Sequence, residues 1–319
     1  MARVATFHRS GGGGWPQAAP AGSLRLLTGY CRAMRIAFAI LLAFLAAPAG
    51  AQSLKPFKDE LFRYPGVLSE QDGGAFVTVD YREMRDINER DEVPERRVGA
   101  DYVQLSVRSQ QKDLVAQTAA GPVRHFAVGR AQGASMITVY IHGQGGSRRQ
   151  GVDDFTFGGN FNRIKNLMWA NGGLYLTPDF SEFGPKGVEQ VAALLASYLE
   201  AAPSAKLFVA CGSAGGAICW GLADHAGIAP RLDGILMLGS FPSKDFARSA
   251  AARRKVPLFL GQGSRDTVFA VDTVEALYRS LRGAGYPVRM ARFETGTHGT
   301  PIRMVDWRLT LNWMLGQGD

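Results

Sequence analysis

A serine at position 213 stands where an apolar stretch gives way to a glycine-rich turn and then to a helical pattern. The segment reads Leu207-Phe208-Val209-Ala210-Cys211-Gly212-Ser213-Ala214-Gly215-Gly216. A serine nucleophile at the end of a strand needs a sharp turn, with small residues two positions before and after it. Gly215 meets the second requirement, and Cys211 is small enough for the first. The other interpretation of this segment is a glycine-rich turn that only ends a strand.

A second glycine-rich segment follows another apolar stretch. Thr138–Ile141 is a candidate strand, and it leads into His142-Gly143-Gln144-Gly145-Gly146. Glycines let backbone N–H groups approach an oxygen that becomes negative during acyl transfer. A phosphate-binding loop is disfavoured, because the segment lacks both a Gly-Lys-Ser/Thr ending and a spaced G-x-G-x-x-G pattern.

Together the two segments resemble the α/β-hydrolase family, and the second resembles the oxyanion-hole loop of its esterases and lipases. The resemblance covers residues 125–315. It implies an α/β fold with a mostly parallel central sheet and helices on both faces. It also implies Ser213 as nucleophile and the backbone N–H groups of Gln144 and Ala214 as oxyanion donors. Cys211 departs from the family pattern, which usually has glycine there, and this leaves a catalytically silent binding protein as an alternative.

In this family the acid and then the histidine follow the nucleophile, each beyond a strand. Asp266 follows the apolar run Pro257–Leu260, and His298 follows Val288–Phe293. We therefore expect His298 to be the base and Asp266 the acid that orients it. Asp179 and Glu182 also follow a strand and are rivals to Asp266.

The other histidines after the leader have different contexts. His125 lies in the early β region, His142 belongs to the glycine-rich loop, and His225 is near the end of a helix. These dispersed histidines, without an H-E-x-x-H motif, disfavour a metal site, and the expected chemistry needs no cofactor. A carboxylic-ester hydrolase is the first hypothesis, on a small-molecule or polymeric ester. A peptidase or thioesterase would use the same parts.

Apolar runs alternate with longer helical patterns from about Met136 onward, which predicts βαβ units and a parallel sheet. The expected strands are Met136–Ile141, Leu174–Thr177, Lys206–Ala210, Gly234–Leu238, Pro257–Leu260 and Val288–Phe293, with earlier ones at Phe76–Asp80, Tyr102–Val107 and His125–Val128. The expected helices are Asn162–Ala170, Val188–Leu199, Ala214–Ala223, Val271–Leu281 and Met304–Leu315. The charged stretch Arg82–Arg97 is expected to be a solvated loop.

Two connections bear on substrate selection. The stretch Phe241–Val256 is short and basic, which predicts a minimal cap and an open cleft that admits polar or bulky esters. A longer insertion, Ser147–Phe161, follows the glycine-rich loop directly. Its charged and aromatic side chains either recognise substrate or form a surface excursion. They are Arg148, Arg149, Asp153, Asp154, Phe155 and Phe157.

The start of the chain is unlike the rest. Residues 34–51 have a basic start, an apolar run and a small-residue ending, Ala49-Gly50-Ala51, as in a secretory signal peptide. The apolar run is too short for a stable membrane anchor. We expect translation to start at Met34, residues 1–33 to be non-structural, residues 52–319 to form one domain, and the mature chain to be periplasmic or extracellular.

Charge and cysteine content limit the remaining possibilities. Residues 1–51 contribute five arginines to the net charge of +8. The rest of the chain has 31 basic and 28 acidic side chains, a net charge of +3. This excess is too small to predict nucleic-acid binding. After the leader only Cys211 and Cys219 remain, so a disulfide scaffold is excluded. We expect these two as buried thiols, although a bridge is conceivable in an oxidising compartment. The oligomeric state is left open.

Overall fold

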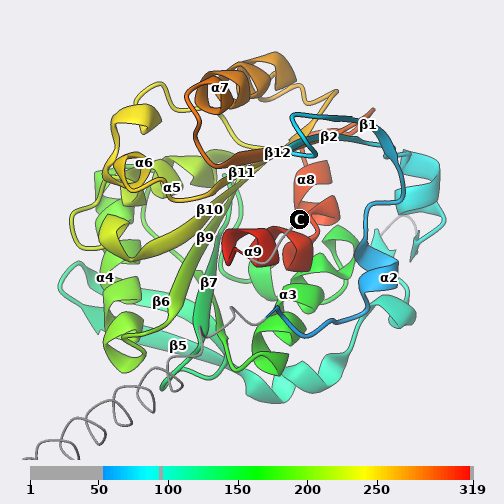
Figure 1. The fold of residues 1–319 in the computed structure, drawn as a ribbon. Coiled ribbons are helices and arrows are strands. Elements are labelled where there is room, and N and C mark those ends of the chain that lie inside the picture. Colours follow the sequence, from blue (N-terminus) through cyan, green and yellow to red (C-terminus); the bar gives the residue numbers. More distant parts are fainter. Residues whose placement is uncertain (1–52, 93–95, 317–319) are drawn as a thin grey trace, which may run out of the picture. The chain divides into compact units, whose positions relative to one another are not determined.

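The computed structural model describes residues 53–92 and 96–316 of the chain. Its main feature is a ten-stranded sheet in the order β1-β2-β12-β11-β10-β9-β7-β8-β6-β5 (Figure 1). The strands are β1 Val67–Gln71, β2 Phe76–Val79, β5 Gln111–Thr118, β6 Gly121–Gly129, β7 Met136–Ile141, β8 Leu174–Pro178, β9 Lys206–Gly212, β10 Leu232–Leu238, β11 Leu258–Gly263 and β12 Val288–Phe293. A separate pair consists of β3 Asp91–Glu92 and β4 Arg97–Val98. The signal peptide expected at residues 34–51, and residues 1–33, lie outside the described residues.

The centre of the sheet is parallel, as the alternation of strand and helix patterns predicts. All neighbours from β2 through β12, β11, β10, β9, β7 and β8 pair in parallel. The pairs β1·β2, β6·β8 and β5·β6 are antiparallel and lie toward the two edges. Strands β7, β8 and β11 are buried along their whole length, which explains their mostly apolar sequences.

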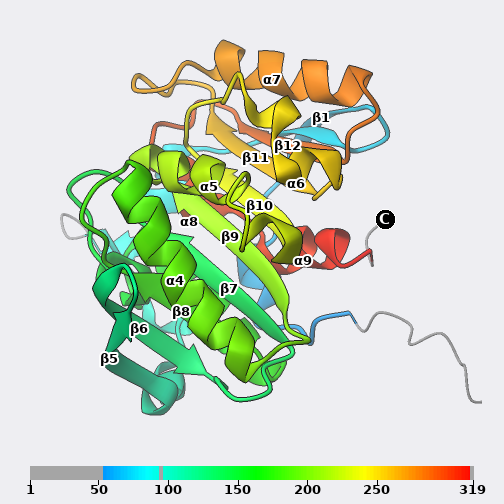
Figure 2. The same ribbon diagram turned by 90° about the vertical axis from the view of Figure 1, so that its left-hand side faces the viewer.

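Helices cover both faces of the sheet (Figures 1 and 2). One face packs against α4 Pro185–Ala201, α5 Gly216–Leu222, α6 Ala250–Arg253 and α7 Val271–Gly283. The other face packs against α3 Asn160–Ala170, α8 Thr300–Met304 and α9 Trp307–Met314. A further short helix, α2 Asp59–Phe62, lies near the start of the described chain. None of the described helices is long and apolar enough to cross a membrane.

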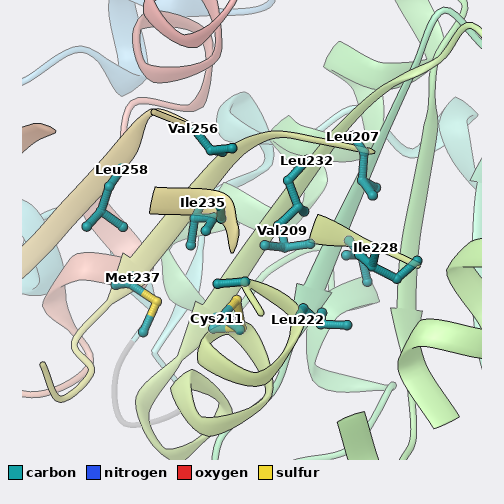
Figure 3. Packing of buried hydrophobic residues seen from close by; sticks show 14 of the residues in the cluster. Leu207, Val209, Cys211, Leu222, Ile228, Leu232, Ile235, Met237, Val256 and Leu258 are labelled. Atoms are coloured by element: carbon teal, nitrogen blue, oxygen red, sulfur yellow. A yellow bond between two sulfur atoms is a disulfide. The ribbon is translucent and has the colours of Figure 1, made fainter. Parts of the chain in front are cut away.

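Alternate residues of each central strand supply the two cores. On β9, Val209 and Cys211 pack toward α4 and α5, whereas Phe208 and Ala210 pack toward α3 and α9. Figure 3 shows the first of these cores, where side chains of β9 and β10 lie beside Leu222 of α5. This packing fixes the positions of the strand ends, which carry the residues of the candidate site.

Two expectations for the region before residue 136 were wrong. Tyr102–Val107, expected as a strand, lies in two 3-10 helices, Ala100–Tyr102 and Leu105–Gln110. The backbone between them, at Gln104, hydrogen-bonds to the Asn162 side chain and not to a neighbouring strand.

The charged stretch Arg82–Arg97, expected as a solvated loop, contains a π-helix at Met84–Asn88 and strands β3 and β4. Its carboxylates Asp86 and Asp91 are buried, because Arg85 and Arg303 pair with them. Ion pairing to a distant residue therefore makes part of this charged stretch interior.

Candidate active site

Ser213 occupies a strained turn between strand β9 and helix α5. β9 ends at Gly212, a 3-10 turn spans Ser213–Gly215, and α5 begins at Gly216. The Ser213 backbone has φ of +51°, a conformation that non-glycine residues rarely adopt. Such strain persists only where the surroundings determine the backbone, and it is common at functional sites.

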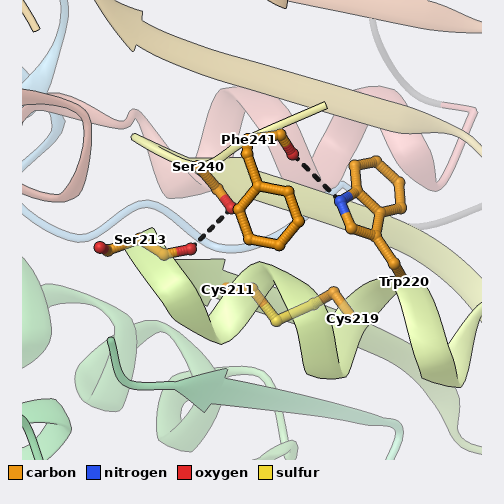
Figure 4. Close-up of a disulfide and its surroundings, with 6 residues drawn as sticks. All are labelled: Cys211, Ser213, Cys219, Trp220, Ser240 and Phe241. Atoms are coloured by element: carbon orange, nitrogen blue, oxygen red, sulfur yellow. Dashed lines mark hydrogen bonds between the residues drawn. A yellow bond between two sulfur atoms is a disulfide. The ribbon is translucent and has the colours of Figure 1, made fainter. Parts of the chain in front are cut away.

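Close packing on both sides holds this turn. A Cβ placed on Gly215 would lie 2.6 Å from the His142 carbonyl oxygen, and one on Gly216 would lie 2.0 Å from Ser240 Oγ. The Ser240 hydroxyl also donates a hydrogen bond of 2.7 Å to the Ser213 carbonyl oxygen (Figure 4). The turn thus has room for glycine only at the two positions that follow Ala214.

A disulfide joins Cys211 on β9 to Cys219 on α5 (Figure 4). The expectation of two separate buried thiols was therefore wrong. The sharp turn brings α5 back along the face of β9 toward which Cys211 points, and the two Cα atoms are 6.2 Å apart, within reach of a bridge. The bond links the strand before Ser213 to the helix after it.

Three side chains predicted from the sequence come together at the carboxyl ends of β9, β11 and β12. His298 Nε2 lies 2.8 Å from Ser213 Oγ, and His298 Nδ1 lies 2.8 Å from Asp266 Oδ2. Asp266 follows β11 and His298 follows β12, so parallel pairing places both loops at the edge where Ser213 lies. This geometry suits proton transfer from the serine to the imidazole.

Asp266 is held as a carboxylate that orients the imidazole. Its side chain is fully buried, and burial alone would raise its pKa. Hydrogen bonds from His298 and from the backbone N–H groups of Phe269 and Val268 outweigh this effect, so the pKa of Asp266 lies below its ordinary value. Gln262 Nε2 also donates to Oδ2 at 2.8 Å. The carboxylate is therefore charged and fixed in place.

The two rival acids have other partners. Asp179 forms an ion pair of 2.7 Å with Arg148 and accepts the Arg148 backbone N–H. Glu182 accepts the backbone N–H of Lys186 at the start of α4. Neither carboxylate hydrogen-bonds to His298, and this leaves Asp266 as the acid in contact with the imidazole.

The glycine-rich loop lies directly against the candidate nucleophile. A Cβ on Gly143 would lie 2.7 Å from Ser213 Cβ and 3.2 Å from its Oγ. Gln144 follows in a turn closed by the Gly146 N–H on the Gly143 carbonyl, and the Gln144 N–H has no acceptor among the described residues. The Ala214 N–H belongs to the first turn of a helical segment, where no intrahelical acceptor exists. Two N–H groups are thus available close to Ser213, as an oxyanion site requires.

Aromatic side chains border the site on two sides. The Phe269 ring lies 5.6 Å from the His298 ring and 5.4 Å from Phe241, between ring centroids. On the side of the glycine-rich loop, the His142 ring stacks on Phe180 at 4.6 Å. The sequence did not single out Phe180 and Phe269, because isolated phenylalanines carry no local signal for a site.

The insertion after the glycine-rich loop is largely tied down by ion pairs. Arg148 pairs with Asp113 as well as Asp179, and the buried Asp154 pairs with Lys165 and Arg108. Within the insertion, Arg149, Asp153, Asp154 and Phe155 line a cavity of about 500 Å³. Phe157 instead lines a separate cavity of about 260 Å³, to which Thr297 and Gly299 on either side of His298 also contribute.

No large cap covers the site between β10 and β11. That connection holds only a 3-10 turn at Phe246–Arg248 and the short helix α6. Among the described residues, no cluster of three or more histidine, cysteine, aspartate or glutamate side chains could hold a metal ion.

Comparison with known proteins confirms the fold. No protein-family model matches the chain, and no curated protein matches its sequence. Among solved structures, it is similar to an Agrobacterium tumefaciens protein of unknown function described as a candidate α/β hydrolase, with 15% identity and a TM-score of 0.52 over 64% of this chain and 97% of the other. It is also similar to a thermostable esterase, with 13% identity and a TM-score of 0.54 over 67% of this chain and 64% of the other. The chain has the α/β-hydrolase fold.

Proposed function

We propose that this chain is a serine hydrolase and, within that class, a carboxylic-ester hydrolase. The observation that carries the proposal is the hydrogen-bonded series of Ser213, His298 and Asp266, with both contacts at 2.8 Å. The strained Ser213 backbone and the available N–H groups of Gln144 and Ala214 support the same conclusion.

The residues have complementary roles in this reaction. His298 Nε2 takes the hydroxyl proton as Ser213 Oγ attacks the carbonyl carbon, and Asp266 stabilises the resulting imidazolium. The two N–H groups stabilise the negative oxygen of the tetrahedral intermediate. His298 then gives the proton to the leaving alcohol, and an acyl-enzyme on Ser213 remains. Water activated by His298 hydrolyses this acyl-enzyme, and no cofactor takes part.

Hydrolysis of short p-nitrophenyl esters by the purified protein tests this function. We expect turnover by the wild type and none above background for Ser213→Ala. The matched control is Ser240→Ala, which removes a hydroxyl that hydrogen-bonds to the Ser213 carbonyl and should reduce activity less. A folded wild type that hydrolyses no ester, thioester or peptide would support the alternative, a catalytically silent binding protein.

The same assay separates the related activities. A thioester or a peptide cleaved with higher kcat/KM than the corresponding oxygen ester would identify the thioesterase or peptidase instead. A series of acyl esters of increasing length tests the open cleft that the minimal connection between β10 and β11 favours. A strong preference for long acyl chains would contradict it.

We further propose that the protein is exported to the periplasm or beyond, as the leader pattern at residues 34–51 predicts. The Cys211–Cys219 disulfide supports this proposal, because such bonds persist mainly in oxidising compartments. N-terminal sequencing of the mature protein tests it, with Gln52 as the expected first residue. A mature chain that retains residues 1–33 would contradict it.

A further inference from the structure

A small cavity lies beside the loop that carries His298. Thr297 and Gly299, the two chain neighbours of His298, both line it, and so does Phe157, whose ring would be 3.6 Å from a Cβ on Gly299. Its volume of about 260 Å³ is below the roughly 300–1,000 Å³ of pockets for drug-sized ligands. It can therefore take one part of a substrate. We call it the Arg96 pocket, after the arginine in its lining.

The position of this pocket indicates which part of an ester substrate it would bind. In the proposed mechanism His298 donates its proton to the leaving alcohol, so the alcohol must lie beside the imidazole. A pocket lined by both neighbours of His298 is therefore placed for the alcohol side of the ester, whereas the acyl carbon stays at Ser213 Oγ.

The lining of the Arg96 pocket is rich in hydrogen-bond donors, and no carboxylate is among the described residues that line it. The polar side chains are the hydroxyls of Tyr81, Thr156, Thr297 and Thr300 and the guanidinium groups of Arg96 and Arg303. Burial raises the pKa of Tyr81, so its hydroxyl stays protonated at neutral pH. This composition suits a negatively charged oxygen group better than an apolar one.

Two buried carboxylates near the pocket are already paired with arginines. Asp91 is bound by Arg303, and Asp86 is bound by Arg85. Among the described residues, the Arg96 guanidinium forms an ion pair with Glu83 alone, at 3.4 Å, and 60% and 54% of the two side chains are exposed. A long contact between exposed side chains contributes little free energy and is easily exchanged for another carboxylate.

An additional positive charge lies behind the pocket. Arg90 has no carboxylate partner among the described residues, and its side chain lies over the Tyr102 ring. Gly158 separates it from Arg303, since a Cβ there would be 3.0 Å from Arg303 Nη1 and 3.3 Å from Arg90 Nη2. Arg90 thus adds, close to Arg303, a guanidinium charge that no described carboxylate pairs with.

We propose that the Arg96 pocket binds a carboxylate on the leaving alcohol, an inference that rests on the proposed esterase activity. The substrate class is thus an ester in which the alcohol portion is a hydroxy acid with a free carboxylate. Arg96 exchanges its contact with Glu83 for that carboxylate, and the neighbouring hydroxyls complete its hydrogen bonds. Arg96 is a specificity-determining residue in this scheme and takes no part in the bond-breaking step.

The test compares two acetyl esters of similar shape, the charged 3-acetoxybenzoate and the neutral 3-acetoxybenzamide, and each rate is normalised to the uncatalysed hydrolysis of that ester. We expect wild-type kcat/KM to favour the carboxylate by roughly tenfold at low salt and less at high salt. Arg96→Gln should abolish the preference by lowering kcat/KM for the carboxylate, and Arg96→Lys should restore part of it. Glu83→Gln should increase the preference, because the competing carboxylate is gone.

Arg97→Gln is the matched control. It removes the same charge from the next residue, whose guanidinium lies over Phe155 and lines the other cavity. Its preference should stay within about twofold of wild type, because only long-range charge is lost.

An unchanged preference in Arg96→Gln, with the amide still hydrolysed through Ser213, would overturn this inference and leave the proposed function intact. Equal losses in Arg96→Gln and Arg97→Gln would also overturn it, in favour of general electrostatic attraction. Failure of the proposed function itself has a different result, in which neither ester is hydrolysed.

Discussion

The turn that carries Ser213 and the loops that carry Asp266 and His298 are held by different forces. Around the turn the constraints are steric and covalent, with glycines in contact with backbone and a disulfide between β9 and α5. Around Asp266 the constraints are hydrogen bonds, two from backbone N–H groups and two from side chains. The first region should therefore respond to added volume, and the second to charge and pH.

Loss of the imidazole should have the largest effect. We expect His298→Ala to lower kcat/KM by about 10⁴- to 10⁶-fold, because base and acid functions disappear together. His225→Ala is the matched control, since among the described residues the imidazole of His225 hydrogen-bonds only to Glu189 and to its own turn. Steady-state ester hydrolysis measures both variants. A loss in His298→Ala below about tenfold would exclude His298 as the base.

Removal of the Asp266 charge should have the next largest effect. Asp266→Asn keeps the size of the side chain but cannot fix the same tautomer of His298, so kcat/KM should fall by about 10⁴-fold. Asp179→Asn, which removes the rival carboxylate paired with Arg148, should reduce activity far less. The reverse order of the two losses would assign the acid to Asp179.

The same variant tests the electrostatic nature of the loops through stability. Because the pKa of Asp266 is lowered in the folded protein, its charge stabilises the fold above the unfolded value of about 4. This contribution is lost as pH falls through the lower folded pKa. The difference in unfolding free energy between wild type and Asp266→Asn should be constant above about pH 4 and shrink below it. A difference independent of pH would contradict the lowered pKa.

Added volume beside Ser213 should have an intermediate effect. In Gly143→Ala the new methyl group would collide with Ser213 Cβ, and the resulting displacement should lower kcat/KM by about 10²-fold. Gly283→Ala is the control, because nothing lies within 4 Å of its added Cβ. Wild-type activity in Gly143→Ala would show that the turn is less confined than its packing indicates.

The disulfide should affect stability more than activity. Replacement of both Cys211 and Cys219 by alanine should lower the unfolding free energy by about 2–3 kcal/mol, because the bond closes a short loop in the unfolded chain. Activity should stay within about tenfold of wild type, since glycine packing still fixes Ser213. Denaturant unfolding with and without reductant measures the effect, and reductant should change only the wild type.

The sequence predicted the parts of this protein whose signals are local. The parallel strands follow from apolar runs that alternate with helical patterns. Ser213 was predicted from the glycine-rich turn after such a run, and Asp266 and His298 from the chain order that the α/β-hydrolase resemblance implies. The disulfide was missed because it depends on how closely α5 returns along β9, which spacing alone does not define. The buried part of Arg82–Arg97 was missed because Asp91 finds its partner, Arg303, more than two hundred residues away. The strand expected at Tyr102–Val107 was wrong because Asn162 supplies the hydrogen bonds of Gln104.

The central claim, that Ser213 is an activated nucleophile, is tested most directly by covalent labelling. Intact-mass analysis after treatment with a fluorophosphonate should show one added group, which peptide mapping places on Ser213. Ser213→Ala should take no label, and His298→Ala should react far more slowly, because the hydroxyl then lacks its base. A folded wild-type protein that remains unlabelled, or that is labelled elsewhere, would contradict the claim.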